Sequence, residues 1–491
     1  MDLPRFCSGH LIASYAIKEN GQPVESLQLD TNGSVRMNKP LLILPVENQV
    51  RELDAKLLLA CLAAPEGYRS IIGLKSRIDL RLGRFPPSIY FAKSLTNNNI
   101  KVYRILRKLG HCIIACDEEA LVHYPPEIYY ARRVGMEALN LIDILIAWGE
   151  ANRTLLEGCP GFGGHDKIKV LGNPRVDFLR PELSGFFDDQ VESLRKQHGD
   201  FILINTNFGS INCYDDKFNL FCWKNGQLAP GRGSRGMPRD YAEGLFHYRT
   251  QIFEEFRRMI PRIAAAFPEN KIIVRPHPAE DPAVWREHLP SNSNVVVVRE
   301  GNVVPWLRAC KCLIHNGCTT AVEGFILGAR IISFVPIEDG RYEFALPNTF
   351  GRRAGGVEAV VEAVREIDTL PNADEALQAR LAAESICALD DQLASERILE
   401  LVKTVTFPQS RSNAIGERLA GRFAAESRAL WKQIKRWTDG AGDDQGFMRQ
   451  RFPKLVVAEL QNRLDRLSTV LGKTAAVRVK QREEDVFEVY S

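Results

Sequence analysis

The sequence lacks the features of a membrane-spanning, secreted or nucleic-acid-binding chain. None of its apolar runs approaches the length of about 18 residues that a membrane-spanning helix needs. Its first residues, MDLPRFCSGHLIASYAIKENG, include Asp2 and no clean apolar core, so they do not resemble a secretion signal. The net charge of +3 is small for 491 residues and gives no case for nucleic acid as a partner. A cytoplasmic protein is expected.

The sequence also lacks the ligand-binding patterns of several enzyme classes. It has no P-loop and no GxGxxG after a strand, which argues against NTP hydrolysis and dinucleotide redox chemistry. Its 11 cysteines show no CxxC pair or zinc-like spacing, and those inside apolar strands, such as Cys112 and Cys312, are expected to be reduced core residues. No Asp-x-Asp pair stands in a loop suited to a metal–diphosphate contact. No metal and no cofactor are expected.

From Pro40 onward, apolar strands alternate with amphipathic helices such as 50–64 and 241–267. This alternation is typical of parallel sheets with crossover helices. It occurs in two series, which predicts an α/β fold of two Rossmann-like, doubly wound domains facing a cleft. Residues 209–240 are expected to form a loop. The predicted strands lie at 40–46, 68–74, 88–94, 111–117, 143–149 and the start of 167–179, and then at 201–207, 271–277, 294–300, 311–317 and 329–335.

The predicted domains follow from these two series. They are a lead-in (1–38), an N-terminal Rossmann-like domain (39–183), a C-terminal Rossmann-like domain (184–405) and a basic helical extension (406–491). The extension contains the amphipathic segments SRALWKQIKRW and KLVVAELQNRLDRLSTVL. It is expected to serve as a helical cap or oligomer contact, or to touch anionic lipid through its basic face. Its last residues, VRVKQREEDVFEVYS, are too charged to assign.

Two strand ends in the second series have polar residues suited to a phosphate. In KIIVRPHP, Arg275 and His277 lie two residues apart and would share one side of an extended chain. Pro276 and Pro278 stiffen the backbone and exclude the middle of a paired strand. His277 can then donate to a phosphate oxygen while Arg275 adds charge. The alternative is a turn with a satisfied histidine.

The second of these strand ends, HNGCTTAVEGFILG, runs directly into a helix. Thr319 or Thr320 can cap the helix with Glu323 in a capping box, which accounts for them without a ligand. The capping box does not account for the polar residues at the strand end, where helix N–H groups favour an anion. Those residues are His315, Asn316 and Gly317. Glu323 could also hold a ribose hydroxyl pair.

Candidate residues for the chemistry lie in the first series. Asp117, Glu118 and Glu119 follow the strand HCIIA, and crowded carboxylates raise one another's pKa, which suits acid–base work. The alternative is an acidic helix N-terminus. Other strand ends supply candidates for the cleft floor, although Arg51 and Asp54 could simply pair with each other. These candidates are Glu47, Arg51, Asn173, Arg175 and Asn207.

Over residues 40–405 the chain resembles bacterial surface-carbohydrate biosynthesis proteins of the GT-B glycosyltransferase type. The resemblance is carried by LPVENQVRELDAKLLLA, CDEEA, IAWGEANRTLLEG, KIKVLGNPRVDFLRPEL, INTNFGSIN and the two second-series motifs. A His-Pro motif followed by a hydroxyl pair looks like the users of CMP-sugars, the sialyltransferases and Kdo (3-deoxy-manno-octulosonate) transferases. The resemblance implies that His277 and Pro278 contact the CMP phosphate and cytidine.

It also implies that Thr319 and Thr320 contact the phosphate, and that Glu118-Glu119-Ala120 matches an acidic motif that usually ends in glycine.

The expected function is transfer of a sugar from a nucleotide donor to a growing surface polysaccharide or lipopolysaccharide glycan. The donor is expected to be a CMP-linked acidic sugar such as Kdo or a nonulosonate, and the acceptor a glycan or lipid-linked glycan. The mechanism is expected to be metal-independent, with protein cations and helix N-termini stabilising the phosphate charge. Three alternatives stay open: a UDP-GlcNAc 2-epimerase, a CDP-glycerol-type polymer transferase, and a non-catalytic scaffold that recruits assembly partners.

Overall fold

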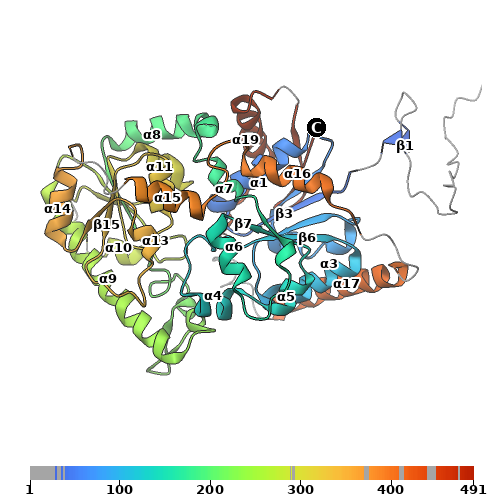
Figure 1. Ribbon diagram of the computed structural model, residues 1–491, viewed down its shortest axis with the longest axis horizontal. Helices are drawn as coiled ribbons and strands as arrows, with labels where there is room; N and C mark the ends of the chain where they lie inside the picture. Colours follow the sequence, from blue (N-terminus) through green and yellow to red (C-terminus); the bar gives the residue numbers. More distant parts are fainter. Residues whose placement is uncertain are drawn as a thin grey trace, which may run out of the picture. The chain divides into compact units, whose positions relative to one another are not determined.

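The computed structural model describes residues 28–29, 35–36, 39–287, 289, 293–369, 375–407, 414–438, 449, 451–473 and 476–491. Residues 41–491 form one compact body (Figure 1). Within the predicted lead-in, β1 (Gln28–Leu29) pairs antiparallel with β2 (Val35–Arg36), and most of that segment lies outside the described residues. None of the helices in the described residues is long and apolar enough to span a membrane.

The first sheet has a parallel core of six strands, and all six predicted strands of the first series are confirmed. Its order is β17-β18-β4-β3-β5-β6-β7-β8, with β3 beside both β4 and β5. The central strands are continuous apolar runs because helices cover both faces of the sheet. The six parallel strands are β3 (Leu42–Val46), β4 (Ser70–Leu74), β5 (Ile89–Ala92), β6 (Cys112–Cys116), β7 (Ile144–Ala147) and β8 (Ile168–Val170).

The second sheet is parallel throughout and has the order β13-β12-β9-β14-β15-β16. Counted along the chain, this is the Rossmann order 3-2-1-4-5-6, in which the connections reverse between β9 and β14. Its strands are β9 (Ile202–Asn205), β12 (Ile272–Arg275), β13 (Val295–Val297), β14 (Cys312–His315), β15 (Ile331–Phe334) and β16 (Arg352–Ala354). Two Rossmann-like sheets in one body confirm the predicted α/β class.

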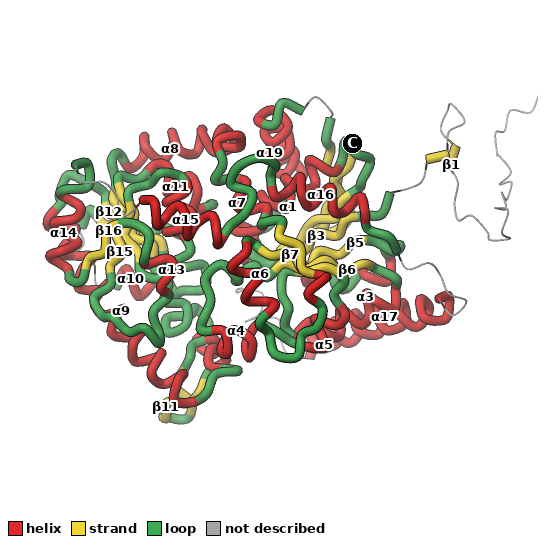
Figure 2. The backbone as a smooth tube through the Cα atoms, viewed as in Figure 1, coloured by secondary structure: helices red, strands yellow, loops and turns green. Residues whose placement is uncertain are grey.

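Helices surround both sheets, and each sheet forms the middle layer of its half (Figure 2). The most buried is α1, whose sequence QVRELDAKLLLACLA contacts α7, α16 and α19 as well as β3. The helices are α1 (Gln49–Ala63), α2 (Lys75–Ile78), α3 (Ile100–Leu109), α4 (Pro126–Arg133), α5 (Met136–Leu141), α6 (Glu150–Glu157), α7 (Pro174–Asp177), α8 (Asp188–His198), α9 (Arg239–Ala266), α10 (Ala283–Arg286), α11 (Val303–Ala309), α12 (Thr320–Ile326), α13 (Ala345–Asn348), α14 (Val357–Arg365), α15 (Glu375–Ser385), α16 (Ala394–Thr404), α17 (Ala414–Thr438) and α19 (Val457–Val470).

The C-terminal extension is not wholly helical, which corrects the expectation for 406–491. After α17 and α19 the chain ends in β17 (Arg478–Glu483) and β18 (Val486–Tyr490), which pair antiparallel and add to the edge of the first sheet at β4. The buried Glu488 of β18 is 3.3 Å from Arg69 and 3.5 Å from Lys480. These cations, Lys480 from the paired strand and Arg69 from a distant part of the chain, neutralise a charge that made the segment look unlike a strand.

The predicted loop at 209–240 contains a hairpin, so that prediction is wrong over its centre. β10 (Phe221–Lys224) pairs with β11 (Gln227–Pro230) through Asn225 and Gly226. Both turn residues have positive φ, 51° and 78°. An Asn-Gly pair is the preferred sequence for such a two-residue turn, so the signal was present in the sequence.

Candidate functional site

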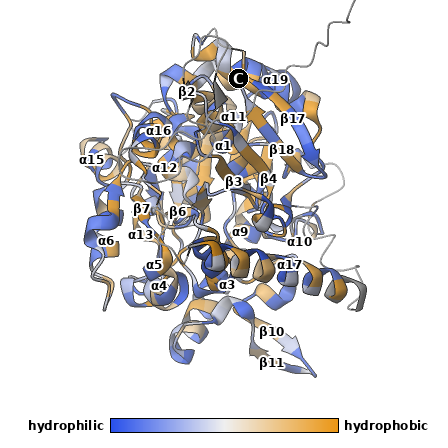
Figure 3. Ribbon diagram, turned by 90° about the vertical axis from the view of Figure 1, so that its right-hand side faces the viewer, coloured by the Kyte–Doolittle hydropathy of each residue, from blue (hydrophilic) through white to orange (hydrophobic). Residues whose placement is uncertain are grey.

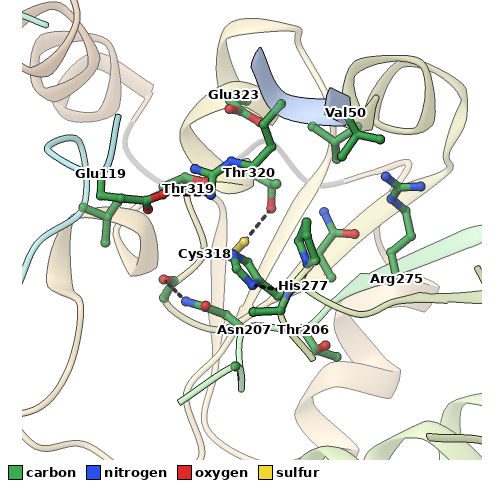
Figure 4. Close-up of a pocket in the computed structure, with 18 of the residues that line it drawn as sticks. Val50, Glu119, Thr206, Asn207, Arg275, His277, Cys318, Thr319, Thr320 and Glu323 are labelled. Atoms are coloured by element: carbon green, nitrogen blue, oxygen red, sulfur yellow. Dashed lines mark hydrogen bonds and ion pairs between the residues drawn. The ribbon is translucent and has the colours of Figure 1, made fainter. Parts of the chain in front are cut away.

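A pocket of about 370 Å³ lies between the carboxyl ends of the two sheets. It is lined by Asn205 and Arg275 at the ends of β9 and β12, and by Val50 and Glu119, which follow β3 and β6 (Figure 4). The carboxyl edge of a parallel sheet is where α/β proteins bind ligands. The volume of the pocket is in the range of sites for small molecules and cofactors.

The structure brings together most of the predicted site residues, from both series. Those that line the pocket are Arg51, Glu119, Arg175, Asn207, Arg275, His277, Pro278, Gly317, Thr319, Thr320 and Glu323. The other predicted residues are described but do not line the pocket. These are Glu47, Asp117, Glu118, Asn173, His315 and Asn316.

His277 is held as a hydrogen-bond donor toward the pocket. Its Nδ1 accepts a hydrogen bond of 3.2 Å from the backbone N–H of Ala279. Burial, followed by the nearby guanidinium of Arg51, lowers the pKa of His277 to about 4, so the ring is neutral at pH 7. A neutral imidazole carries one proton, which must then sit on Nε2. His277 can therefore donate to a ligand but cannot accept a proton from one at Nε2.

The loop that carries His277 is organised by Glu280, a residue that the sequence analysis missed. Glu280 is fully buried, and its Oε1 accepts hydrogen bonds from His277 N, Phe208 N and Thr206 Oγ1 at 3.0, 3.0 and 2.8 Å. Its Oε2 accepts from Trp285 Nε1 at 3.0 Å. One carboxylate thus ties the His-Pro turn to the end of β9. An acidic residue directly after His-Pro-Ala was the available signal.

The pocket has an excess of cations. Seven arginines line it, against the carboxylates of Asp54, Glu119 and Glu323. The arginines are Arg51, Arg132, Arg133, Arg175, Arg249, Arg275 and Arg299. An anionic ligand would compensate this charge.

Several of these arginines donate to backbone carbonyls, and Arg249 and Arg275 are two of them. Arg249 of α9 donates to the carbonyl of Asn207, and Arg275 donates to the carbonyls of Glu300 and Gly301 at 2.6 and 2.8 Å. Among the described residues neither forms an ion pair. Burial lowers the pKa of Arg249, and it lowers that of Arg275 to about 10. Both stay charged at pH 7 and are unfavourably desolvated without a bound anion.

Of the three candidate carboxylates, only Glu119 faces the pocket (Figure 4). Its Oε1 lies 3.0 Å from Arg51 Nη1, and its side chain is 48% exposed. Burial alone would raise its pKa, but the charges of Arg51 and Arg133 outweigh that effect and lower the pKa of Glu119 to about 2. The expected mutual rise in pKa is therefore wrong for this carboxylate.

The other two carboxylates each have their own partners and are nearly inaccessible. Asp117 is 3% exposed, pairs with Arg133 and accepts a hydrogen bond of 2.9 Å from the Tyr129 hydroxyl. Glu118 is 8% exposed, accepts from Asn173 Nδ2 at 3.2 Å and lies 3.8 Å from Arg175. Through these contacts Asp117 and Glu118 fix the position of the segment that carries Glu119.

The cleft-floor candidates also have defined contacts. Arg51 pairs with Glu119 and not with Asp54, which accepts from Asn302 Nδ2 at 3.2 Å. Asn173 caps α7 by accepting from Arg175 N at 3.0 Å. Glu47 pairs with Lys93 at 3.1 Å. Of these candidates, Arg51, Arg175 and Asn207 remain in contact with the pocket.

In the segment HNGCTT the first two residues are structural. His315 is fully buried, and its Nε2 lies 2.9 Å from Ser333 Oγ, which itself donates to the carbonyl of Phe350. Because that hydroxyl proton is used, His315 Nε2 must be the donor. Asn316 donates to the carbonyl of Phe334 at 2.8 Å. Both residues fix the end of β14 and do not reach the pocket.

The following residues turn into the pocket. Gly317 has a φ of +57°, and its carbonyl accepts from Asn207 Nδ2 at 3.0 Å. Thr319 stands at the N-cap of α12 without a capping hydrogen bond from its side chain. Glu323 binds Arg175 at 3.0 Å and has its second carboxylate oxygen buried without a partner. The alternative capping box therefore does not form, and the Glu323 oxygen is available to a ligand.

Asn205 is a further pocket residue that the sequence analysis missed. It is 4% exposed at the end of β9, and both polar atoms of its amide are buried and have no hydrogen-bond partner among the residues that the structure describes. Buried amides nearly always have partners, so this one points to a bound molecule. Its place in the sequence INTN gave no signal that separated it from Asn207.

The described residues contain no group of His, Cys, Asp and Glu side chains suited to a metal ion.

No protein-family model matches the chain, and no curated protein matches it. Among solved structures, UDP-GlcNAc 2-epimerase of Methanocaldococcus jannaschii with UDP-GlcNAc and UDP aligns over 75% of this chain and 100% of its own, at 12% identity and a TM-score of 0.45. Anabaena HepE with UDP-glucose aligns over 74% of this chain and 98% of its own, at 13% identity and a TM-score of 0.40. A variant of the wall teichoic acid polymerase TagF aligns over 75% of this chain and 89% of its own, at 11% identity and a TM-score of 0.43. Such values describe a distant likeness in chain path and establish no function.

Proposed function

We propose that the protein is a GT-B-type glycosyltransferase that takes a sugar from a nucleotide donor bound in this pocket. The observation that carries the proposal is the pair Arg249 and Arg275, two guanidinium groups that line the pocket and have no carboxylate partner within the described part of the chain. A phosphorylated ligand would compensate both charges. The unpartnered amide of Asn205 beside them supports a ligand that also accepts or donates hydrogen bonds.

The second sheet is proposed to hold the nucleotide. His277 donates its Nε2 proton to a phosphate oxygen, and the Thr319 hydroxyl approaches the same phosphate from the start of α12. Glu323 accepts from a ribose hydroxyl through its unpartnered oxygen, while Arg175 fixes the other oxygen. This division leaves the first sheet, with Glu119 and Arg51, to face the acceptor.

We propose a CMP-linked acidic sugar, such as Kdo or a nonulosonate, as the donor. It carries two separate negative groups, the phosphate and the sugar carboxylate. The pocket offers cations on both sides, with Arg249 and Arg275 on the second sheet and Arg51 and Arg133 on the first. A guanidinium can bind either anion in a bidentate manner.

In the proposed reaction Glu119 removes the proton from an acceptor hydroxyl. The acceptor oxygen then bonds to the anomeric carbon of the sugar while the bond from that carbon to the phosphate oxygen breaks. CMP leaves with the bonding electron pair, and His277 and the arginines stabilise its charge. The charge of Arg51 keeps Glu119 a weak base. A bound donor anion would raise the pKa of Glu119 and so increase its basicity.

The acceptor is proposed to be a growing surface polysaccharide or lipopolysaccharide glycan, and the place of action the cytoplasm. Every described cysteine is a free thiol, including Cys112 and Cys312. Thiols in this state fit a reducing compartment.

The test measures nucleotide release by chromatography after incubation with CMP-Kdo, a CMP-nonulosonate, CDP-glycerol or UDP-GlcNAc, each with a glycan acceptor. CMP release from CMP-Kdo or the CMP-nonulosonate that depends on acceptor and is lost in His277→Ala supports the proposal. His247→Ala, at an exposed histidine of α9, is the matched control. CMP release from CDP-glycerol alone would replace the CMP-sugar donor by the CDP-glycerol alternative, and UDP release from UDP-GlcNAc alone would favour the epimerase-like alternative. Release of no nucleotide, with His277→Ala harmless in cells, would favour the scaffold.

A further inference from the structure

Helix α17 packs on the body through small residues. It lies alongside α3 and the 3-10 turn η1 (Leu82–Arg84) (Figures 1 and 3). A Cβ on Gly421 would lie 3.0 Å from that of Lys108, and one on Gly83 would lie 3.3 Å from that of Ala425. Glycine and alanine thus allow the close approach, and no large apolar side chain is needed on this side of the helix.

The large apolar side chains of α17 point the other way. Ile415, Leu419, Phe423, Leu430 and Ile434 are 73, 59, 74, 60 and 53% exposed, and they form what we term the apolar stripe. Their spacing of 4, 4, 7 and 4 residues places them on one face of an α-helix. A surface helix normally buries its apolar face against the core. In α17 this orientation is reversed, so the stripe is a candidate contact surface.

Basic residues accompany the stripe. Residues 414–438 contain six lysines and arginines against two glutamates. Arg418 and Arg422 each follow a stripe residue by three positions, so they lie beside it on the helix. Long basic side chains can keep their charges at a polar interface while their stems cover apolar surface.

We propose that α17 docks onto an anionic lipid surface, with the apolar stripe in the headgroup–acyl boundary and its cations against lipid phosphates. A helix of 25 residues spans about 37 Å, enough for a stable interfacial contact. The occupant is lipid and not a second copy of the chain, because a second α17 would bring its own excess of cations against this one. The inference does not depend on what the pocket binds.

The test is flotation of the full-length protein with vesicles of phosphatidylcholine alone or mixed with phosphatidylglycerol. The natural protein is expected to float with the anionic vesicles and much less with the neutral ones. Leu419→Ser combined with Phe423→Ser is expected to reduce binding at least tenfold, since each side chain loses its apolar contact with the lipid. Arg418→Gln with Arg422→Gln is expected to reduce it roughly tenfold at low salt and less at high salt.

Val456→Ser, at another apolar residue that is 50% exposed, serves as the control and should bind as the natural protein does. Melting curves show whether each variant is folded. Equal binding by the stripe variant, or no binding of the natural protein to anionic vesicles, overturns the proposal. Sedimentation equilibrium provides the second readout: a dimer that the stripe variant abolishes would assign the surface to a second copy instead.

Discussion

His277 and His315 lie near the same edge of the second sheet, yet His277 lines the pocket and His315 is fully buried. His315 is the last residue of β14 and is fully buried, with its ring bound to Ser333. His277 lies two residues beyond the end of β12 and faces the pocket. The ring of His315 is enclosed by its contact with Ser333, although the strand residues in register with it, Asn205 and Arg275, do line the pocket. A side chain beyond the strand rises above the edge, where ligands bind.

The carboxylates after β6 show a similar difference. Asp117 and Glu118 are the first and second residues past the strand and are buried, whereas Glu119, the third, reaches the pocket. After β6, distance from the end of the strand therefore separates the two supporting residues from the one that can touch a ligand. Polar character alone does not separate them.

The largest expected effect is at Glu119. Glu119→Gln keeps the shape of the side chain but cannot accept the proton of an acceptor hydroxyl, so kcat should fall by about 10²- to 10⁴-fold. Donor affinity, measured by calorimetry with CMP, should change much less. Glu127→Gln, at an exposed glutamate of α4, is the control. Unchanged turnover in Glu119→Gln would place the base elsewhere.

A somewhat smaller effect is expected at His277. His277→Ala removes one hydrogen-bond donor to the leaving phosphate, which should lower kcat by roughly 10²- to 10³-fold. The variant should melt near the natural temperature because the ring is only partly buried. His315→Ala is expected to show the reverse pattern, with lower thermal stability and activity retained per folded molecule. Equal losses of activity in both folded variants would contradict the difference between the two histidines.

Glu280→Gln tests whether the loop that Glu280 holds in place positions His277. The amide nitrogen of glutamine must face a donor, either Trp285 Nε1 or the group of donors at Oε1, so at least one buried hydrogen bond is lost. The expected cost is about 1–3 kcal/mol of unfolding free energy in chemical denaturation. Turnover should fall about tenfold with little change in KM. Glu287→Gln, at an exposed position, should leave both unchanged.

The sequence pattern predicts the two parallel sheets well because their strands are apolar throughout. β3, with five buried residues in LILPV, needs no information from elsewhere in the chain. β18 was not predicted, since its buried Glu488 becomes acceptable only when Lys480 and Arg482 of the paired strand and Arg69, more than 400 residues away, fold beside it. Charge pairing across such separations is not visible in a local pattern.

The site was predictable only in part, because some of its residues stand in local sequence motifs and others do not. His277 and Thr319 stand in motifs at strand ends, where the pattern is local. Arg249 lies in the middle of the 28-residue helix α9, where an arginine resembles any surface charge. Only folding shows that it is 4% exposed and lines the pocket. The cation excess that supports the proposed function is therefore a property of the structure.

The smallest expected effect concerns pH and the two histidines. Burial lowers the pKa of His315 to about 3 and contributes most to lowering that of His277 to about 4, whereas an unfolded histidine titrates near 6.5. Between pH 6.5 and pH 4 the unfolded chain binds more protons than the folded one, so stability falls as the pH falls. Chemical denaturation should show a loss on the order of 2–3 kcal/mol from His315 over this window. His315→Gln should remove that part of the slope, and His277→Gln should remove less, because its ring is partly exposed. A slope unaffected by His315→Gln would mean that His315 is not held neutral and buried, and the contrast between the two histidines would fail.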